Sequence, residues 1–226
     1  GSTDMTSTFV NDLRLNEQET GDNSGSWGTV TNTNLTLIGE ALGYGAQQVF
    51  GSDANATTTV ADGAADPARA MYFKVTSAGN LTATRTMTIA PNTVSRLMFI
   101  ENATSGSQSI AVSQGSGANV TIPAGDVKVI YTDGAGSGGA VVDAFASLSV
   151  VDLNVSGAVD IDGAVQIDNT LTVGVDDTGY DVKFFGATAS AFMQWDASAD
   201  DLILGGAAGL SVNSAALVTG VLTTTA

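Results

Sequence analysis

The chain has 226 residues, of which 43% are hydrophobic and only 13% are charged, and it contains 27 glycines. This composition favours short strands and many turns, because long exposed helices need more Lys, Arg and Glu. The net charge of −16, with seven Lys and Arg, excludes a nucleic-acid partner and disfavours an anionic membrane surface. No apolar run approaches membrane-spanning length, so we expect no membrane insertion. The absence of cysteine and histidine excludes disulfides, zinc sites with these ligands and Ser-His-Asp or Cys-His catalysis.

An N-terminal unit is predicted over residues 5–50, after a cloning remnant at residues 1–4 (GSTD). It holds the best helical pattern of the chain, TNTNLTLIGEALG, with Asn32 or Asn34 as N-cap and Gly43 as the terminator. So short a helix has to dock on something to persist, and we expect this unit to attach the protein to a partner. The predicted attachment residues are Trp27, Leu35, Ile38 and Leu42.

Residues 51–67 are rich in Ala, Thr, Asp and Gly and predict a linker with at most one strand, at TTTV. Residues 68–146 predict an antiparallel β-sandwich module, because strand candidates follow one another with turn residues between them and no helix. The strand candidates are Arg69–Thr76, Leu81–Ile89, Ser95–Glu101, Gln108–Ser113, Asn119–Ile122, Asp126–Tyr131 and Ala140–Phe145. The predicted core consists of Met87, Ile89, Leu97, Phe99, Ile110, Val112, Val120, Ile122, Val127, Val129 and Tyr131.

Residues 147–175 contain a six-residue repeat that is clearest from Leu153 onward (LNVSGA VDIDGA VQIDNT LTVGVD). Apolar and polar residues alternate as in a half-buried strand, and Gly157, Gly163 or Asn169 offers a corner where positive φ is tolerated. Such repeats occur in β-solenoids and fibrous β-prisms, but four units cannot cover their own apolar columns. We therefore expect three chains to meet around one axis. The predicted trimer core consists of Leu153, Val155, Val159, Ile161, Val165, Ile167, Leu171 and Val173.

Residues 176–226 predict a small distal β-module with its own aromatic core. The strand candidates are Asp181–Phe185, Phe192–Asp196, Leu202–Leu204 and Leu210–Asn213. The aromatic residues expected to form the core are Phe184, Phe185, Phe192 and Trp195.

Carboxylates are the main chemical groups left for a site. Asp160 and Asp162 are weak candidates for a calcium site, since calcium takes several oxygen ligands. Both occupy outward-facing positions of the repeat, so a solvated polar face is the expected role, and we expect no cofactor. Trp27 and Trp195 could stack on sugars, but each has apolar neighbours, which favours a core role. The carboxylates are scattered, with few aromatic residues to line a sugar cleft, so we expect the protein not to be an enzyme.

Three stretches together resemble bacteriophage tail fibres and related virion proteins, especially those of marine phages. They are GSWGTVTNTNLTLIGEAL (25–42), the β-module TMTIAPNTVSRLMFIENATSGSQSIAVSQGSGANVTIPAGDVKVIYTDG (86–134), and residues 153–204 with LNVSGAVDIDGAVQI and GYDVKFFGATASAFMQWDASADDLIL. The resemblance implies a homotrimeric fibre on the virion surface. Its N-terminal part would attach to other virion tail proteins, and its distal part would face a host surface glycan or protein. No catalytic residues follow from the resemblance.

The expected fold is all-β with one short N-terminal helix, in which small β-sandwich modules are joined by a short trimeric β-prism or β-helix-like shaft. Two alternatives to a tail fibre remain open at this point. A capsid decoration or neck protein would also be small, acidic and β-rich. A tailspike that cleaves glycans would need two facing carboxylates in an exposed cleft.

Overall fold

The computed structural model describes residues 7–223, so the predicted cloning remnant at 1–4 lies outside the described residues. The chain divides after Leu153 into two compact units, each of which is described by itself. Both units are built mainly from β-strands, and the first also carries the α-helix. The prediction of a mostly β protein with one N-terminal helix is therefore confirmed.

The first unit contains the helix and nine strands. In chain order the elements are α1 (Trp27–Ala41), β1 (Tyr44–Phe50), β2 (Ala56–Thr59), the 3-10 helix η1 (Pro67–Arg69), β3 (Tyr72–Ser77), β4 (Arg85–Ala90), β5 (Ser95–Asn102), β6 (Ile110–Ser113), β7 (Val120–Ile122), β8 (Val127–Asp133), the 3-10 helix η2 (Gly136–Gly138) and β9 (Val141–Asp143).

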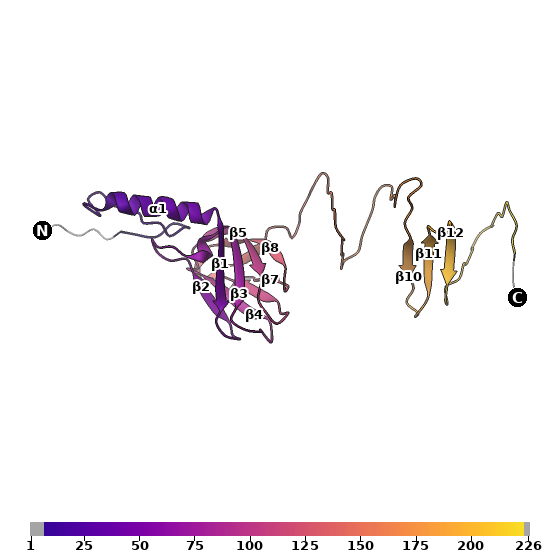
Figure 1. Ribbon diagram of the computed structural model, residues 1–226, viewed down its shortest axis with the longest axis horizontal. Helices are drawn as coiled ribbons and strands as arrows, with labels where there is room; N and C mark the ends of the chain where they lie inside the picture. The colour runs from indigo at the N-terminus through magenta and orange to yellow at the C-terminus, as the bar shows by residue number, and fades with distance from the viewer. Residues whose placement is uncertain (1–6, 224–226) are drawn as a thin grey trace. The chain divides into compact units, whose positions relative to one another are not determined.

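These strands form two sheets that pack face to face (Figure 1). The five-stranded sheet has the order β1-β3-β5-β8-β9, and the four-stranded sheet has the order β2-β4-β6-β7. From β1 to β6 the chain changes sheet after every strand, so β1, β3 and β5 pair in parallel, as do β2, β4 and β6. The predicted wholly antiparallel arrangement is wrong here. The Gly- and Asn-rich connections look like hairpin turns in the sequence, but they carry the chain from one layer to the other.

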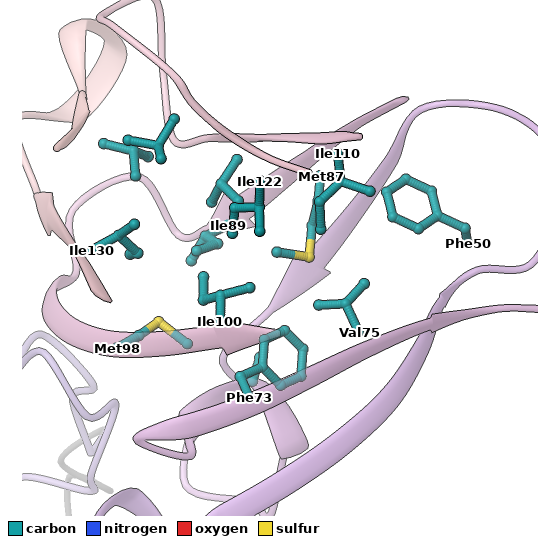
Figure 2. Close-up of a cluster of buried hydrophobic side chains, with 14 of the residues drawn as sticks. Phe50, Phe73, Val75, Met87, Ile89, Met98, Ile100, Ile110, Ile122 and Ile130 are labelled. Carbon is teal, nitrogen blue, oxygen red and sulfur yellow. The ribbon is translucent and has the colours of Figure 1, made fainter. Parts of the chain in front are cut away.

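The core lies between the two sheets and is lined by aliphatic, Met and Phe side chains from both (Figure 2). Six predicted core residues are buried there: Met87, Ile89, Ile110, Val112, Val120 and Ile122. The prediction is wrong for Leu97, Phe99, Val127, Val129 and Tyr131, which lie on the opposite side of β5 and β8. Their neighbours Met98, Ile100 and Ile130 point into the core instead. Both sides of β5 are apolar, so alternation alone could not decide between them. In β8 the outward set Val127, Val129 and Tyr131 is more apolar than the inward set Lys128, Ile130 and Thr132, so alternation favoured the wrong side.

The predicted linker at 51–67 is part of the sandwich. It contains β2, which pairs with β4, and η1, which leads into β3. The hydroxyl of Thr58 is buried and donates a hydrogen bond of 2.7 Å to the Gln47 side chain on β1. The buried hydroxyl of Thr58 on β2 is thus satisfied by a side chain of β1. A strand rich in threonine has low apolar content, and for that reason the sequence indicated a linker here.

Helix α1 begins earlier than predicted, with Ser26 rather than Asn32 or Asn34 as N-cap. Its first two turns contain only Trp27 and Val30 as large apolar residues, so apolar periodicity does not reveal them. Asn34 has another role, because its side chain accepts a hydrogen bond of 3.0 Å from the Asn16 backbone N–H and donates one of 2.9 Å to the Asn16 carbonyl. The helix ends at Ala41, close to the predicted Gly43.

Arg69 in η1 fastens the N-terminal segment to the sandwich. Its side chain is fully buried and donates hydrogen bonds to the carbonyls of Leu13 (2.9 Å), Ala64 (2.7 Å) and Ala61 (2.5 Å). Burial lowers the pKa of this guanidinium, and the nearby Asp66 carboxylate opposes that effect. Without Arg69 the three carbonyls would be buried without partners. The Arg69 side chain thus joins the loops by hydrogen bonds to their backbone and not by an ion pair.

The second unit contains a small antiparallel sheet of β10 (Val182–Phe185), β11 (Phe192–Asp196) and β12 (Asp201–Gly205) (Figure 1). These three predicted strands are confirmed, whereas the fourth, at Leu210–Asn213, is not formed. Within the described part of the repeat, residues 154–175 contain no strand, so the shaft stays a prediction. The chain bends at Gly157, Gly163 and Asn169, where corners were predicted, although none of the three has positive φ.

We predict that Arg69→Ala strongly destabilises the first unit, because three buried carbonyls lose their donor. The expected loss is about 3–5 kcal/mol. Native-state hydrogen exchange of the β3 and β5 amides would measure it in the full chain. Arg85→Ala is the control, since Arg85 makes an exposed ion pair with Asp53 (2.8 Å) and its loss should cost much less. Equal losses in the two variants would contradict the role assigned to Arg69.

We predict that the first unit loses stability as the pH falls below about 4, the ordinary range of a carboxyl pKa. Hydrogen bonds from Arg85 hold the pKa of Asp53 well below that range, and those from Lys128 lower the pKa of Asp143. A carboxyl whose folded pKa is lowered stabilises the fold above its unfolded pKa, and protonation removes this contribution on acidification. Thermal unfolding measured between pH 7 and pH 2 should show a shallower decline for the double variant Asp53→Asn/Asp143→Asn.

Candidate assembly surfaces

The predicted attachment residues lie on the exposed side of α1. Trp27 is 66% exposed and Leu42 is 69% exposed, and Leu35 and Ile38 are also exposed. The side chains that hold the helix to the sandwich are those of Leu37 and Ala41, which are buried. The apolar stripe is therefore uncovered by the described part of the chain, and the core role expected for Trp27 is wrong.

A second apolar surface covers the outer side of the five-stranded sheet. We call it the outer face and define it as Tyr44, Tyr72, Leu97, Phe99, Val127 and Tyr131. The strand register aligns Tyr44, Tyr72 and Phe99 in one row across three strands. Their ring centroids are 5.9 Å and 6.4 Å apart, so the rings form a continuous aromatic row.

Few charges interrupt the outer face. Lys74 and Glu101 are register partners on β3 and β5, beside the aromatic row. The Tyr72 hydroxyl donates a hydrogen bond of 3.0 Å to the Glu101 carboxylate, which raises the pKa of Tyr72. The only other acidic residue at an outward position of these strands is Asp133, at the end of β8, where its carboxylate accepts hydrogen bonds from the next turn.

A groove of about 280 Å³ connects the helix with the outer face. Its lining includes Ile38 and Leu42 from α1, Met71 before β3, and Leu97 from β5. The exposed stripe of the helix and the outer face are therefore neighbours, and the groove between them is also lined by Asp12, Ser95 and Arg96. Four residues of the outer face, Leu97, Phe99, Val127 and Tyr131, were predicted in the core, whereas Tyr44 and Tyr72 were not, so the sequence did not reveal this surface.

The small sheet of the second unit has one wholly apolar side. The antiparallel register places six apolar side chains on this side, which we call the apolar sheet face: Val182, Phe184, Met193, Trp195, Leu202 and Leu204. Five of the six are exposed, and Val182 is partly buried. Every charged residue of the three strands, together with the preceding Asp181, lies on the other side.

The aromatic core predicted for this module is wrong. Phe184 and Trp195 lie on one side of the sheet, whereas Phe185 and Phe192 lie on the other. On that second side the Lys183 ammonium lies 3.9 Å from the centre of the Phe192 ring. Among residues 154–223 only one side chain, that of Ala191, is buried. The second unit therefore has no core of its own.

The predicted trimer core residues of the six-residue repeat are uncovered as well. All eight are between 47% and 74% exposed. Asp160 and Asp162 also face solvent, and the described residues contain no cluster of three or more acidic side chains that could hold a metal ion. In the part of the chain that the structure describes, helix α1 is too short and too polar to span a bilayer.

Comparison of the chain with protein-family models, with curated proteins and with solved structures finds no match.

We predict that Met193→Asp prevents assembly of the second unit without unfolding the first. Met193 is 41% exposed in the single chain, so an aspartate there meets water and costs a monomer little. In an assembly that covers the apolar sheet face, the same carboxylate would be buried at a cost of several kcal/mol per chain. Size-exclusion chromatography with light scattering would report the mass.

The matched control is Gln194→Asp, one residue away on the other side of the same strand. It adds the same charge to the same strand, so the control should keep the wild-type mass. If the two variants assemble equally well, the apolar sheet face is not a contact between chains.

Proposed function

We propose that the protein is a homotrimeric structural component of a phage virion, and that it acts as a tail fibre. The observation that carries this proposal is the uncovered second unit, in which one whole sheet face is apolar and only Ala191 is buried among residues 154–223. A segment of this kind needs other chains to bury its apolar side chains. The resemblance of three stretches to phage fibres supports the virion as the place where it assembles.

Charge supports a packing in which the apolar sides face the axis. Residues 154–226 contain nine aspartates and one lysine, so this segment repels its own copies unless the carboxylates stay in water. The apolar sheet face holds none of these aspartates. Three such faces can therefore close around an axis while the carboxylates point outward.

The role that follows is mechanical and adhesive. The second unit joins three chains, and the exposed stripe of α1 docks on another virion tail protein. The opposite end of the fibre faces a host surface glycan or protein. In this role the protein needs no catalytic residue and no cofactor.

We predict a trimer mass for the full chain at micromolar concentration, and a loss of that mass in Ile161→Asp. Three carboxylates would meet near one axis in this variant, at a cost of several kcal/mol. Native mass spectrometry would measure both proteins. A monomer or a dimer in the wild-type chain would refute the trimer, and a trimeric variant would refute the assignment of this column to the core.

Asp162→Asn is the control for that experiment. Asp162 directly follows Ile161 in the sequence and lies on the predicted outward side of the repeat, so this substitution should leave the mass unchanged.

Two further measurements separate the tail fibre from its alternatives. Immunogold labelling of virions should mark the tail, whereas label on the capsid or neck would replace the fibre by a decoration or neck protein. Release of reducing sugar from host polysaccharide would instead identify the protein as a glycan-cleaving tailspike.

A further inference from the structure

We propose that the outer face of the first unit packs against a second copy of the chain, so that the copies contact each other in both units. This inference rests on the proposed assembly through the second unit, which brings the first units together. It assigns a contact to a surface of which four residues were predicted to be buried inside one chain.

The first argument comes from the strands themselves. Along β5 the run Leu97-Met98-Phe99-Ile100 is apolar on both sides, and one side already faces the core. In β8 Ile130 faces the core, whereas Val127 and Tyr131 are exposed on the other side. Continuous apolar runs are typical of strands that are covered on both faces, whereas a sheet with one wet face alternates apolar and polar residues. The outer face thus has the composition of a covered surface.

The second argument is charge. A chain with a net charge of −16 repels its copies, so a contact between copies has to avoid the acidic groups. On the outer face Glu101 is matched by Lys74 on the neighbouring strand, and Asp133 lies at the end of β8. A basic partner would find few carboxylates here, whereas another copy meets little repulsion.

The third argument is size. The six side chains of the outer face expose on the order of 500 Å² together, given the area of aromatic and aliphatic side chains. Around a threefold axis the three outer faces would bury on the order of 1,500 Å² together, or about 500 Å² for each pair of copies, which is below the size of a specific interface. Such a contact is weak between free chains but is favoured once another unit joins the same chains, because the effective concentration is then high. This size fits a secondary contact within an assembly.

A glycan is a poorer fit to the outer face. Sugar sites combine aromatic rings with several hydrogen-bonding groups. Here Leu97 lies beside the aromatic row on β5, Val127 is the register partner of Glu101, and the carboxylate of Glu101 already accepts a hydrogen bond from the Tyr72 hydroxyl. Aliphatic side chains and polar groups that already have partners favour contact with another protein surface over contact with a sugar.

The test uses the lack of cysteine in the chain, which allows a single thiol to be introduced. Val127→Cys places it on the outer face, and Thr121→Cys places it at an exposed position on the far side of the four-stranded sheet. Each full-length variant is alkylated with a maleimide, and its mass is measured in the same buffer. We expect a trimer mass for both and a rate at position 127 at least about tenfold slower than at position 121.

A second variant shows whether another copy causes the protection. Leu97→Glu/Tyr131→Glu, added to Val127→Cys, places acidic groups on the outer face of every copy. The alkylation rate should rise to that of position 121 while the second unit keeps the trimer mass. The added negative charge by itself disfavours the thiolate and slows alkylation, so a faster rate reports uncovering.

The outcomes separate the two proposals. Equal rates at positions 127 and 121 in a trimer overturn the outer-face contact and leave the proposed function intact. A monomer mass overturns both. Protection at position 127 that appears only after purified lipopolysaccharide is added also overturns the contact between copies, because the occupant would then be a glycan.

Discussion

A strand that is apolar on both faces has to be covered on both faces, and much of this molecule follows from that constraint. In the first unit one side of these strands is covered, because the chain changes sheet after each strand from β1 to β6 and both sheets contribute to one core. The other side of β5 and β8 is not covered by any part of the chain that the structure describes. In the second unit neither the repeat nor the small sheet is covered. Uncovered apolar strand faces therefore occur in both units, and other copies of the chain could cover them in both.

Polar contacts decide which parts of the first unit stay fixed. Arg69 binds the segment around Leu13, and Asn16 in turn holds Asn34 on α1. Asn102 connects the sheets, since its side-chain amide on β5 donates a hydrogen bond of 3.0 Å to the carbonyl of Ile122 on β7. These contacts keep the helix and both sheets together although the exposed stripe of the helix contributes nothing to the core. That stripe is thereby held in place and remains free to bind.

The sequence was sufficient for the position of most strands, because Gly, Asn and Pro mark their ends and β-branched residues fill them. It was insufficient for the pairing, since the same turn residues serve a hairpin and a crossing between sheets. It also failed for the facing of β5, where Leu97 and Met98 are equally apolar. Trp27 and Trp195 show the same limit, because an apolar neighbourhood in the sequence indicates burial without saying which chain provides it. The apolar columns of the repeat could be read directly, but the partners that would cover them lie outside a single chain.

The order of the five-stranded sheet has a consequence for a protein under tension. Its two edges are β1, which follows α1, and β9, which precedes the exit of the chain from the first unit. A pull applied at β1 and at the end of β9 would therefore load every ladder of the sheet in series. The β8–β9 ladder has three paired residues, whereas the β5–β8 ladder has seven. The short ladder would yield first, and peeling of β9 would lengthen the chain beyond β8 and remove the buried Val141 from the core. β9 is thus the strand at which we expect this unit to extend first under force.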